Sequence, residues 1–172
     1  MYLKVNVASL LKQDVGRDER HQIASTEDRV TGEVKLVRTP RSILATGHLD
    51  TASLCQCSRC LKEFFQPLGL DIEEEFYPTT DIGTGRRLPP PEDPEAFTID
   101  EHQDLDLSEA IRQYGLAAMP MKPLCSPECR GLCPQCGADL NTGPCSCPPA
   151  SDSRWDGLLV LTNTTSSRKR KD

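Results

Sequence analysis

The stretch that decides the fold runs from Pro123 to Cys147 and reads PLCSPECRGLCPQCGADLNTGPCSC. Within it, Cys133-Pro-Gln-Cys136-Gly137 has the features of a zinc knuckle. Two thiolates separated by two residues grip one ion from a tight turn, and the glycine supplies the positive φ that this turn needs. Cys145 and Cys147 follow an Asn-Thr-Gly-Pro turn and complete a four-thiolate site. The stretch therefore predicts a zinc-bound, cysteine-rich ribbon rather than a disulfide framework.

A second site is predicted from the cysteines that remain. Cys125 and Cys129 need two further ligands, and the earlier Cys57-Ser-Arg-Cys60 pair is a match. One ion held by these four would fasten the turn between Cys57 and Cys60 to the segment that follows the predicted helix. The rival arrangement is a cluster confined to the six C-terminal cysteines. The ninth cysteine, Cys55, is interpreted as a small buried strand residue. We expect two Zn²⁺ ions.

Composition and the expected compartment support metal over disulfides. Only 37% of the 172 residues are hydrophobic, and 11 Gly and 14 Pro add turns, so the core is thin and needs cross-links. The N-terminus shows no secretory signal, and no apolar run approaches the roughly 20 residues that span a bilayer. We expect a cytoplasmic protein, or a plastid protein if a transit peptide was removed, with no membrane partner. In the cytosol thiols stay reduced.

Catalytic readings of the cysteines have less support. Thiol redox motifs of the thioredoxin kind stand at a helix N-terminus, whereas Cys57 and Cys60 lie between two extended segments. Catalytic zinc keeps an open position beside a general base. His21, His48 and His102 lie in separate segments, outside ligand spacing of the cysteines. We expect no catalytic residues, no enzymatic activity and no small-molecule substrate.

Hydrophobic periodicity predicts the remaining elements. Residues 30–36, 42–54 and 64–76 alternate apolar and polar side chains as half-buried strands do, and short connections join them. They predict an antiparallel meander with the Cys57 to Cys60 turn at a hairpin tip. A short strand over residues 2–7 and a helical turn over residues 9–12 precede the meander.

A Pro-rich loop near residues 78–95 separates the meander from a predicted helix. Asp106 and Glu109 are interpreted as a capping box, and Pro120 ends the helix. An apolar stripe packs this helix on the sheet, formed by Leu107, Ala110, Ile111, Tyr114, Ala117 and Ala118. The predicted fold class is α+β, a small antiparallel β-meander packed by a helix, with a zinc-bound ribbon. The expected parts are a core over residues 1–124, the ribbon over 125–149, and a helix or extension with a basic tail over 150–172.

Charge is unevenly distributed along the chain. The net charge is −6, but residues 71–109 hold thirteen acidic and two basic residues, so the remainder is positive. Arg59 and Lys62 flank the first knuckle, and Arg130 lies between Cys129 and Cys133. The shared metal site would bring these three together as an RNA contact, or they balance thiolate charge. A basic tail adds candidate nucleic-acid contacts, or is a solvated end: Arg168, Lys169, Arg170 and Lys171.

Several segments together resemble the YceD family, the large ribosomal RNA subunit accumulation proteins. They are Cys57-Ser-Arg-Cys60-Leu61, the Glu-Glu-Phe76-Tyr77 strand end, the Asp-Leu-Ser-Glu helix ending in Met-Pro-Met-Lys-Pro-Leu-Cys125, and Cys129-Arg-Gly-Leu-Cys133-Pro-Gln-Cys136-Gly-Ala-Asp-Leu-Asn141. The resemblance implies a non-enzymatic role in making or preserving large-subunit ribosomal RNA, in the cytosol or a plastid. Family members are often encoded beside a large-subunit ribosomal protein.

This chain departs from the family pattern in two places. Cys55 is additional, and Asp152-Ser-Arg154-Trp155 stands where the family tends to show Asp-Pro-Arg before a Leu-rich helix. Two functional classes follow from the residues and the resemblance. One is a ribosome-biogenesis factor that binds precursor or mature large-subunit rRNA, or a large-subunit ribosomal protein, through a zinc-ordered surface. The other is an adaptor whose acidic residues 71–109 hold a basic partner, and a thiol redox protein is a distant third.

Overall fold

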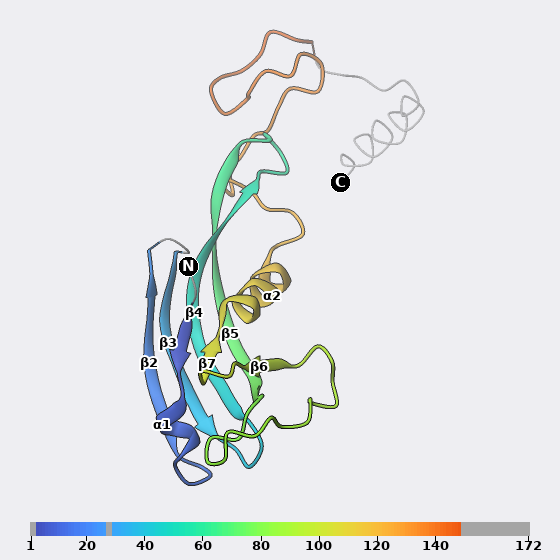
Figure 1. Ribbon diagram of the computed structural model, residues 1–172. Coiled ribbons are helices and arrows are strands. Elements are labelled where there is room, and N and C mark those ends of the chain that lie inside the picture. The colour runs from blue at the N-terminus through green and yellow to red at the C-terminus, as the bar shows by residue number, and fades with distance from the viewer. Residues whose placement is uncertain (1–2, 27–28, 149–172) are drawn as a thin grey trace, which may run out of the picture. The chain divides into compact units, whose positions relative to one another are not determined.

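The computed structural model describes residues 3–26 and 29–148, and the chain divides into two compact units, Met1–Pro127 and Glu128–Asp172. Helices and strands of the described residues all belong to the first unit (Figure 1). In chain order they are β1 (Lys4–Asn6), α1 (Ala8–Leu11), β2 (Asp18–Ser25), β3 (Val30–Arg38), β4 (Ile43–Gln56), β5 (Glu63–Pro78), β6 (Phe97–Ile99), β7 (Asp104–Asp106) and α2 (Ser108–Ala118).

The strands form one seven-stranded sheet in the order β1-β7-β6-β5-β4-β3-β2. Neighbouring strands are antiparallel except β5 and β6, which are parallel. The edge strands β1 and β2 approach each other, because residues 3–6 and residues 21–25 line one cavity of about 430 Å³. The sheet is therefore a nearly closed, barrel-like one.

The core lies on the inner face of this sheet and follows the period of two that strands impose. In β5 the buried side chains stand at even positions, from Leu68 to Phe76, while Asp71, Glu73 and Glu75 face solvent. Both helices add to the same cluster: α1 contributes Leu10 and Leu11, and α2 contributes Ala110 and Ile111.

The hairpin of β4 and β5 extends past this core. The two strands pair along their whole length, from Ile43 opposite Phe76 to Gln56 opposite Glu63. Residues 52–56 and 63–67 include no buried side chain, so the distal part of the hairpin is held by its backbone ladder and cross-strand pairs. Figure 1 shows both strands continuing beyond their neighbours to the turn that carries Cys57 and Cys60. This turn is the hairpin tip that the periodicity predicts.

The three strands predicted to form an antiparallel meander do so as β3, β4 and β5. The expectation that the sheet is small and wholly antiparallel is wrong, because the sheet also includes β2, β6 and β7, which were not predicted, and β6 pairs with β5 in parallel. β2 lies at a sheet edge and reads DERHQIAS, with too few apolar side chains for a period to emerge. β6 and β7 have 3 residues each, which is too short for periodicity to register.

The predicted capping box is wrong, although the helix is present. The Asp106 carboxylate accepts a hydrogen bond from the Ser108 N–H at 2.9 Å. Glu109 points forward along the helix, where its Oε1 accepts from Arg112 Nη2 at 2.6 Å, and this bond lowers the pKa of Glu109 to about 2. The apolar stripe is also shorter than expected, because Ala117 and Ala118 are exposed. Glu109 therefore forms an ion pair with Arg112 instead of capping the N-terminus of the helix.

Two glycines provide a matched test of the packing between β3 and β4. A Cβ at Gly47 would lie 2.2 Å from the Glu33 carbonyl oxygen, whereas a Cβ at Gly115 in α2 would meet nothing within 4 Å. We expect Gly47→Ala to lower the free energy of unfolding by about 1–3 kcal/mol through forced backbone shifts. Gly115→Ala should raise it by about 0.5–1 kcal/mol. Urea unfolding monitored by circular dichroism measures both, and an unchanged midpoint for Gly47→Ala would refute this close approach.

Candidate metal centres

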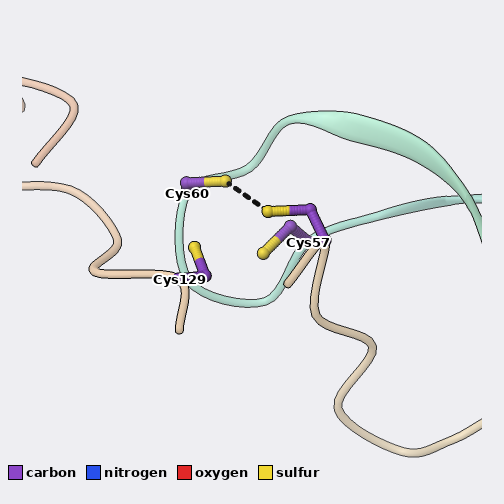
Figure 2. Close-up of side chains that lie close together, drawn as sticks. Cys57, Cys60 and Cys129 are labelled. Atoms are coloured by element: carbon purple, nitrogen blue, oxygen red, sulfur yellow. Dashed lines mark hydrogen bonds between the residues drawn. The ribbon is translucent and has the colours of Figure 1, made fainter. Parts of the chain in front are cut away.

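The cysteines of the described residues gather into two groups of four. One group contains Cys57, Cys60, Cys125 and Cys129, the other contains Cys133, Cys136, Cys145 and Cys147, and within each group all sulfur atoms lie within 4.8 Å of one another. None of the nine cysteines forms a disulfide. Figure 2 shows the side chains of Cys57, Cys60 and Cys129 turned toward a common centre. Each group could hold a metal ion.

The two knuckles share one backbone geometry. In the first, Cys57 N–H donates to the Lys62 carbonyl at 2.9 Å, and Leu61 N–H donates to the Cys57 carbonyl at 2.9 Å. The second repeats both bonds: Cys133 N–H donates to the Ala138 carbonyl at 2.8 Å, and Gly137 N–H donates to the Cys133 carbonyl at 2.9 Å. The residue after the second cysteine has a φ of 61° in Leu61 and 72° in Gly137. The sequence predicts this conformation for Gly137, and Leu61 adopts it without the help of a glycine.

Hydrogen bonds within the first unit hold the segment that carries Cys125 at the hairpin tip. Ser58 N–H donates to the Pro123 carbonyl at 2.9 Å, and the Arg59 guanidinium donates to the Pro127 carbonyl at 3.5 Å. The Sγ atoms of Cys60 and Cys125 are 3.6 Å apart. The long hairpin and the segment after α2 thus meet at these cysteines, although about 65 residues separate them along the chain.

The second group is local to residues 133–147. Leu132 and Asp139, which flank the Cys133 to Cys136 turn in the sequence, pair as an isolated antiparallel bridge. The Sγ atoms of Cys145 and Cys133 are 3.4 Å apart, and the Gln135 side-chain amide donates to the Pro148 carbonyl at 2.9 Å. The chain after the knuckle therefore folds back over it and delivers the last two thiols.

The sulfur positions fit a tetrahedral metal ion. A Zn–S bond of about 2.3 Å places the four sulfur atoms of a tetrahedron about 3.8 Å apart. The 3.6 Å between Cys60 and Cys125 and the 3.4 Å between Cys145 and Cys133 are close to that spacing. Four thiols with no open position form the donor set of a structural site rather than a catalytic one.

In each group, local hydrogen bonds favour the ionised form of one thiol. Backbone hydrogen bonds from Cys125, Cys60 and Arg59 lower the pKa of Cys57 to about 6. In the second group, backbone hydrogen bonds from Cys136 and Gln135 lower the pKa of Cys133 to about 6. Hydrogen bonding to the charged form of an acid lowers its pKa in this way.

The fourth thiol of the second group behaves in the opposite sense. A side-chain hydrogen bond with Cys136, burial, and the nearby charge of Cys133 raise the pKa of Cys147 to about 12. Thiolates this close repel one another, and a bound cation would offset that repulsion. The two groups differ in exposure to solvent. Three cysteines of the first group are buried, whereas Cys133 is the one buried cysteine of the second group and Cys136 is exposed.

The predicted RNA-contact residues lie in three different parts of the chain. Arg59 and Lys62 are exposed at the hairpin tip, and Arg130 is exposed in the second unit. Residues 168–171, and the expected extension over residues 150–172, lie outside the described residues. Cys55 is half-buried opposite Phe64 and belongs to neither group of four. The three histidines also lie outside both groups.

Apolar residues on the outer side of the hairpin are not among the contact residues that the sequence predicts. Leu54 and Phe65 are a directly opposed cross-strand pair, exposed to 57% and 45%, and Leu61 is exposed to 55%. The Arg29 guanidinium lies 3.7 Å from the centre of the Phe65 ring, a cation–π contact. The register could have revealed the pair, since Leu54 and Phe65 fall at positions that face away from the core.

Fold and site together define a mostly-strand protein with two groups of four cysteines that could each hold a metal ion. The chain belongs to the YceD family, described as large ribosomal RNA subunit accumulation protein YceD, whose family model matches residues 45–162. The family that the cysteine stretch resembles is therefore confirmed. Among the described residues, no helix is long and apolar enough to cross a membrane.

Similar proteins occur in bacteria and in a plant. Uncharacterized proteins of Mycobacterium tuberculosis and Mycobacterium bovis are 30% identical over 139 residues, which is 80% of this chain and 64% of theirs. This chain thus spans about 64% of the length of these relatives. The large ribosomal RNA subunit accumulation protein YCED homolog 1, chloroplastic, of Zea mays is 40% identical over 48 residues, 27% of this chain and 16% of the plant protein. No solved structure matches.

Proposed function

We propose that this protein is a non-enzymatic ribosome-biogenesis factor that supports the synthesis, processing or accumulation of large-subunit rRNA. In this proposal the two cysteine groups each hold one Zn²⁺ ion, and the zinc-ordered hairpin tip contacts rRNA in the compartment where the ribosome is assembled, the cytoplasm or a plastid. The family description names the large ribosomal RNA subunit, which supports the pathway. The two sets of four converging thiols support the metal.

One observation carries the proposed contact, namely the composition of the hairpin-tip surface, which we define as Leu54, Arg59, Leu61, Lys62 and Phe65. All five side chains are exposed. Aromatic rings and guanidinium groups stack on unpaired bases, and cationic side chains bind phosphates. A hairpin that continues past the core presents such side chains to a large partner, because they are not part of the buried core.

Leu61 adds a second argument for this surface. A non-glycine residue in the left-handed region costs about 1–2 kcal/mol, and an exposed leucine gains little from burial in return. Leu61 has a φ of 61° and is exposed to 55%. Strained residues that persist at an exposed tip are typical of functional surfaces. We therefore include Leu61 in the contact.

The metal proposal predicts a defined loss of zinc from cysteine variants. Native mass spectrometry of the full chain should show two Zn²⁺ ions. Cys57→Ser should retain only the C-terminal ion, and Cys133→Ser only the shared one, because a structural site needs all four thiolates. Cys55→Ser is the matched control and should retain both ions, since Cys55 lies outside both groups. Two ions in Cys57→Ser would instead support the cluster confined to the six C-terminal cysteines.

The RNA proposal predicts that reversing the charges at the hairpin tip weakens RNA binding. Fluorescence anisotropy with transcribed fragments of large-subunit rRNA measures the affinity of the full chain and its salt dependence. We expect Arg59→Glu with Lys62→Glu to weaken binding at least about tenfold and to reduce the salt slope by roughly 2, one for each lost phosphate contact.

The control for this experiment makes the same charge change elsewhere. Lys12→Glu with Arg17→Glu reverses two exposed cations near α1, where β2 begins, far along the strands from the turn of Cys57. This variant should lose much less affinity. Equal weakening in both double variants would show general electrostatic attraction and contradict the hairpin-tip contact. If purification of the protein from cells recovers no large-subunit rRNA or ribosomal protein, the biogenesis role itself is wrong.

A second candidate function rests on the outer face of β5. Asp71, Glu73 and Glu75 stand at alternate positions there and are exposed, which forms an acidic row along the strand. An adaptor could hold a basic partner on this row, such as a ribosomal protein before assembly. Purification that recovers RNA only through a protein intermediary would favour this candidate. A thiol redox role has less support, because the Cys57 to Cys60 turn lies in a β-hairpin rather than at a helix N-terminus.

A further inference from the structure

The side-chain amide of Asn141 makes hydrogen bonds on both of its sides within the second unit. Its Nδ2 donates to the sulfur of Cys129 at 3.6 Å, and its Oδ1 accepts from the backbone N–H of Arg130 at 2.8 Å. One amide therefore holds the thiol of Cys129 and the peptide group that follows the same residue. Cys129 belongs to the first group of four thiols, whereas Asn141 lies between the knuckle of the second group and its last two cysteines.

Asn141 is itself held in place by the turn of the second group. Asp139 Oδ1 accepts from the Asn141 backbone N–H at 2.8 Å and from Asn141 Nδ2 at 2.7 Å. The turn is closed by a bond from Leu140 N–H to the Gly131 carbonyl at 2.9 Å, and Thr142 Oγ1 donates to the Asp139 carbonyl at 2.8 Å. The orientation of the amide is thus fixed by the turn at residues 139–142 rather than by Cys129.

We propose that Asn141 is a positioning residue that couples the two metal centres. This inference rests on the proposed zinc sites. The Asn141 N–H stabilises the Cys129 thiolate and sets the direction of its sulfur, as hydrogen-bond donors behind metal ligands do. Binding of an ion by Cys133, Cys136, Cys145 and Cys147 fixes the ribbon, and the ribbon fixes Asn141 against Cys129.

The coupling implies an order of metal loading. The C-terminal site closes over residues 133–147 and needs no distant segment, so its loop-closure entropy is small. The shared site must unite Cys57 and Cys60 with Cys125 and Cys129 across more than sixty residues, and benefits from a fourth ligand that is already positioned. The C-terminal ion therefore binds first and raises the affinity of the shared site. By linkage, the shared ion strengthens the C-terminal site by the same factor.

Zinc titration of the full chain against a competing chelator tests the coupling. We expect Asn141→Ala to lower the affinity of the shared site about 10–100-fold, the usual effect of losing an outer hydrogen-bond partner of a metal ligand. Asn141→Asp has nearly the same shape but places a carboxylate beside the thiolate, so its loss should be at least as large. Asn6→Ala is the matched control, because it removes the same kind of side-chain amide, which there donates to Asp104, outside both cysteine groups. It should leave the affinity unchanged.

A double-mutant cycle separates coupling from a local effect on Cys129. Cys133→Ser, which removes the C-terminal ion, should weaken the shared site in the parent chain but have little further effect when Asn141→Ala is present. Additive losses would overturn the coupling. In the cadmium-loaded protein, the ¹¹³Cd resonance of the shared site should shift in Asn141→Ala more than that of the C-terminal site, and a shift confined to the C-terminal site would also overturn it.

The outcomes distinguish this inference from the proposed function. A parent chain that binds no zinc at all refutes the zinc centres and the coupling together. A parent chain that binds two ions, with Asn141→Ala indistinguishable from it in affinity and in the ¹¹³Cd spectrum, refutes only the role of Asn141.

Discussion

The convergence of thiols from two distant stretches of chain is the constraint that acts where hydrophobic burial does not, at the distal end of the β4–β5 hairpin. The distal part of the β4–β5 hairpin contributes no buried side chain to the core, so hydrophobic burial does not hold it. The contacts of Ser58 and Arg59 with the segment after α2 provide part of that support, and the cysteine group lies where they meet. Thiols packed within 4.8 Å repel when ionised, which makes a cation the natural complement of the arrangement.

The Cys57 to Cys60 turn and the Cys133 to Cys136 turn have the same backbone hydrogen bonds, because each must direct two thiols toward one point. A hairpin of the Cys-x-x-Cys type directs backbone N–H groups at its own sulfurs and needs a left-handed residue after the second cysteine. Gly137 meets this need without strain. Leu61 meets it at a cost and remains exposed, so packing in the core does not hold this side chain in place.

Family membership and structure contribute different parts of the functional picture. The family description indicates the large ribosomal RNA subunit, and the chloroplastic relative from Zea mays carries the same description over a short matched region. Neither identifies a surface. The structure adds a projecting hairpin with exposed cations and an exposed aromatic ring, and an acidic row on the outer face of β5. These two surfaces carry opposite charge and therefore suit partners of opposite charge.

Local patterns in the sequence determined the knuckles, the left-handed Gly137, the long hairpin and the existence of α2, because spacing and periodicity act over a few residues. The parallel pairing of β5 with β6, the forward ion pair of Glu109 and the hydrogen bond from Asn141 to Cys129 depended on tertiary structure. Three-residue strands have no readable period, and a carboxylate or amide chooses among partners that only the folded chain brings within reach. For the same reason, spacing suggested which cysteines share a group, while only the fold could place Cys57 and Cys60 beside Cys125 and Cys129.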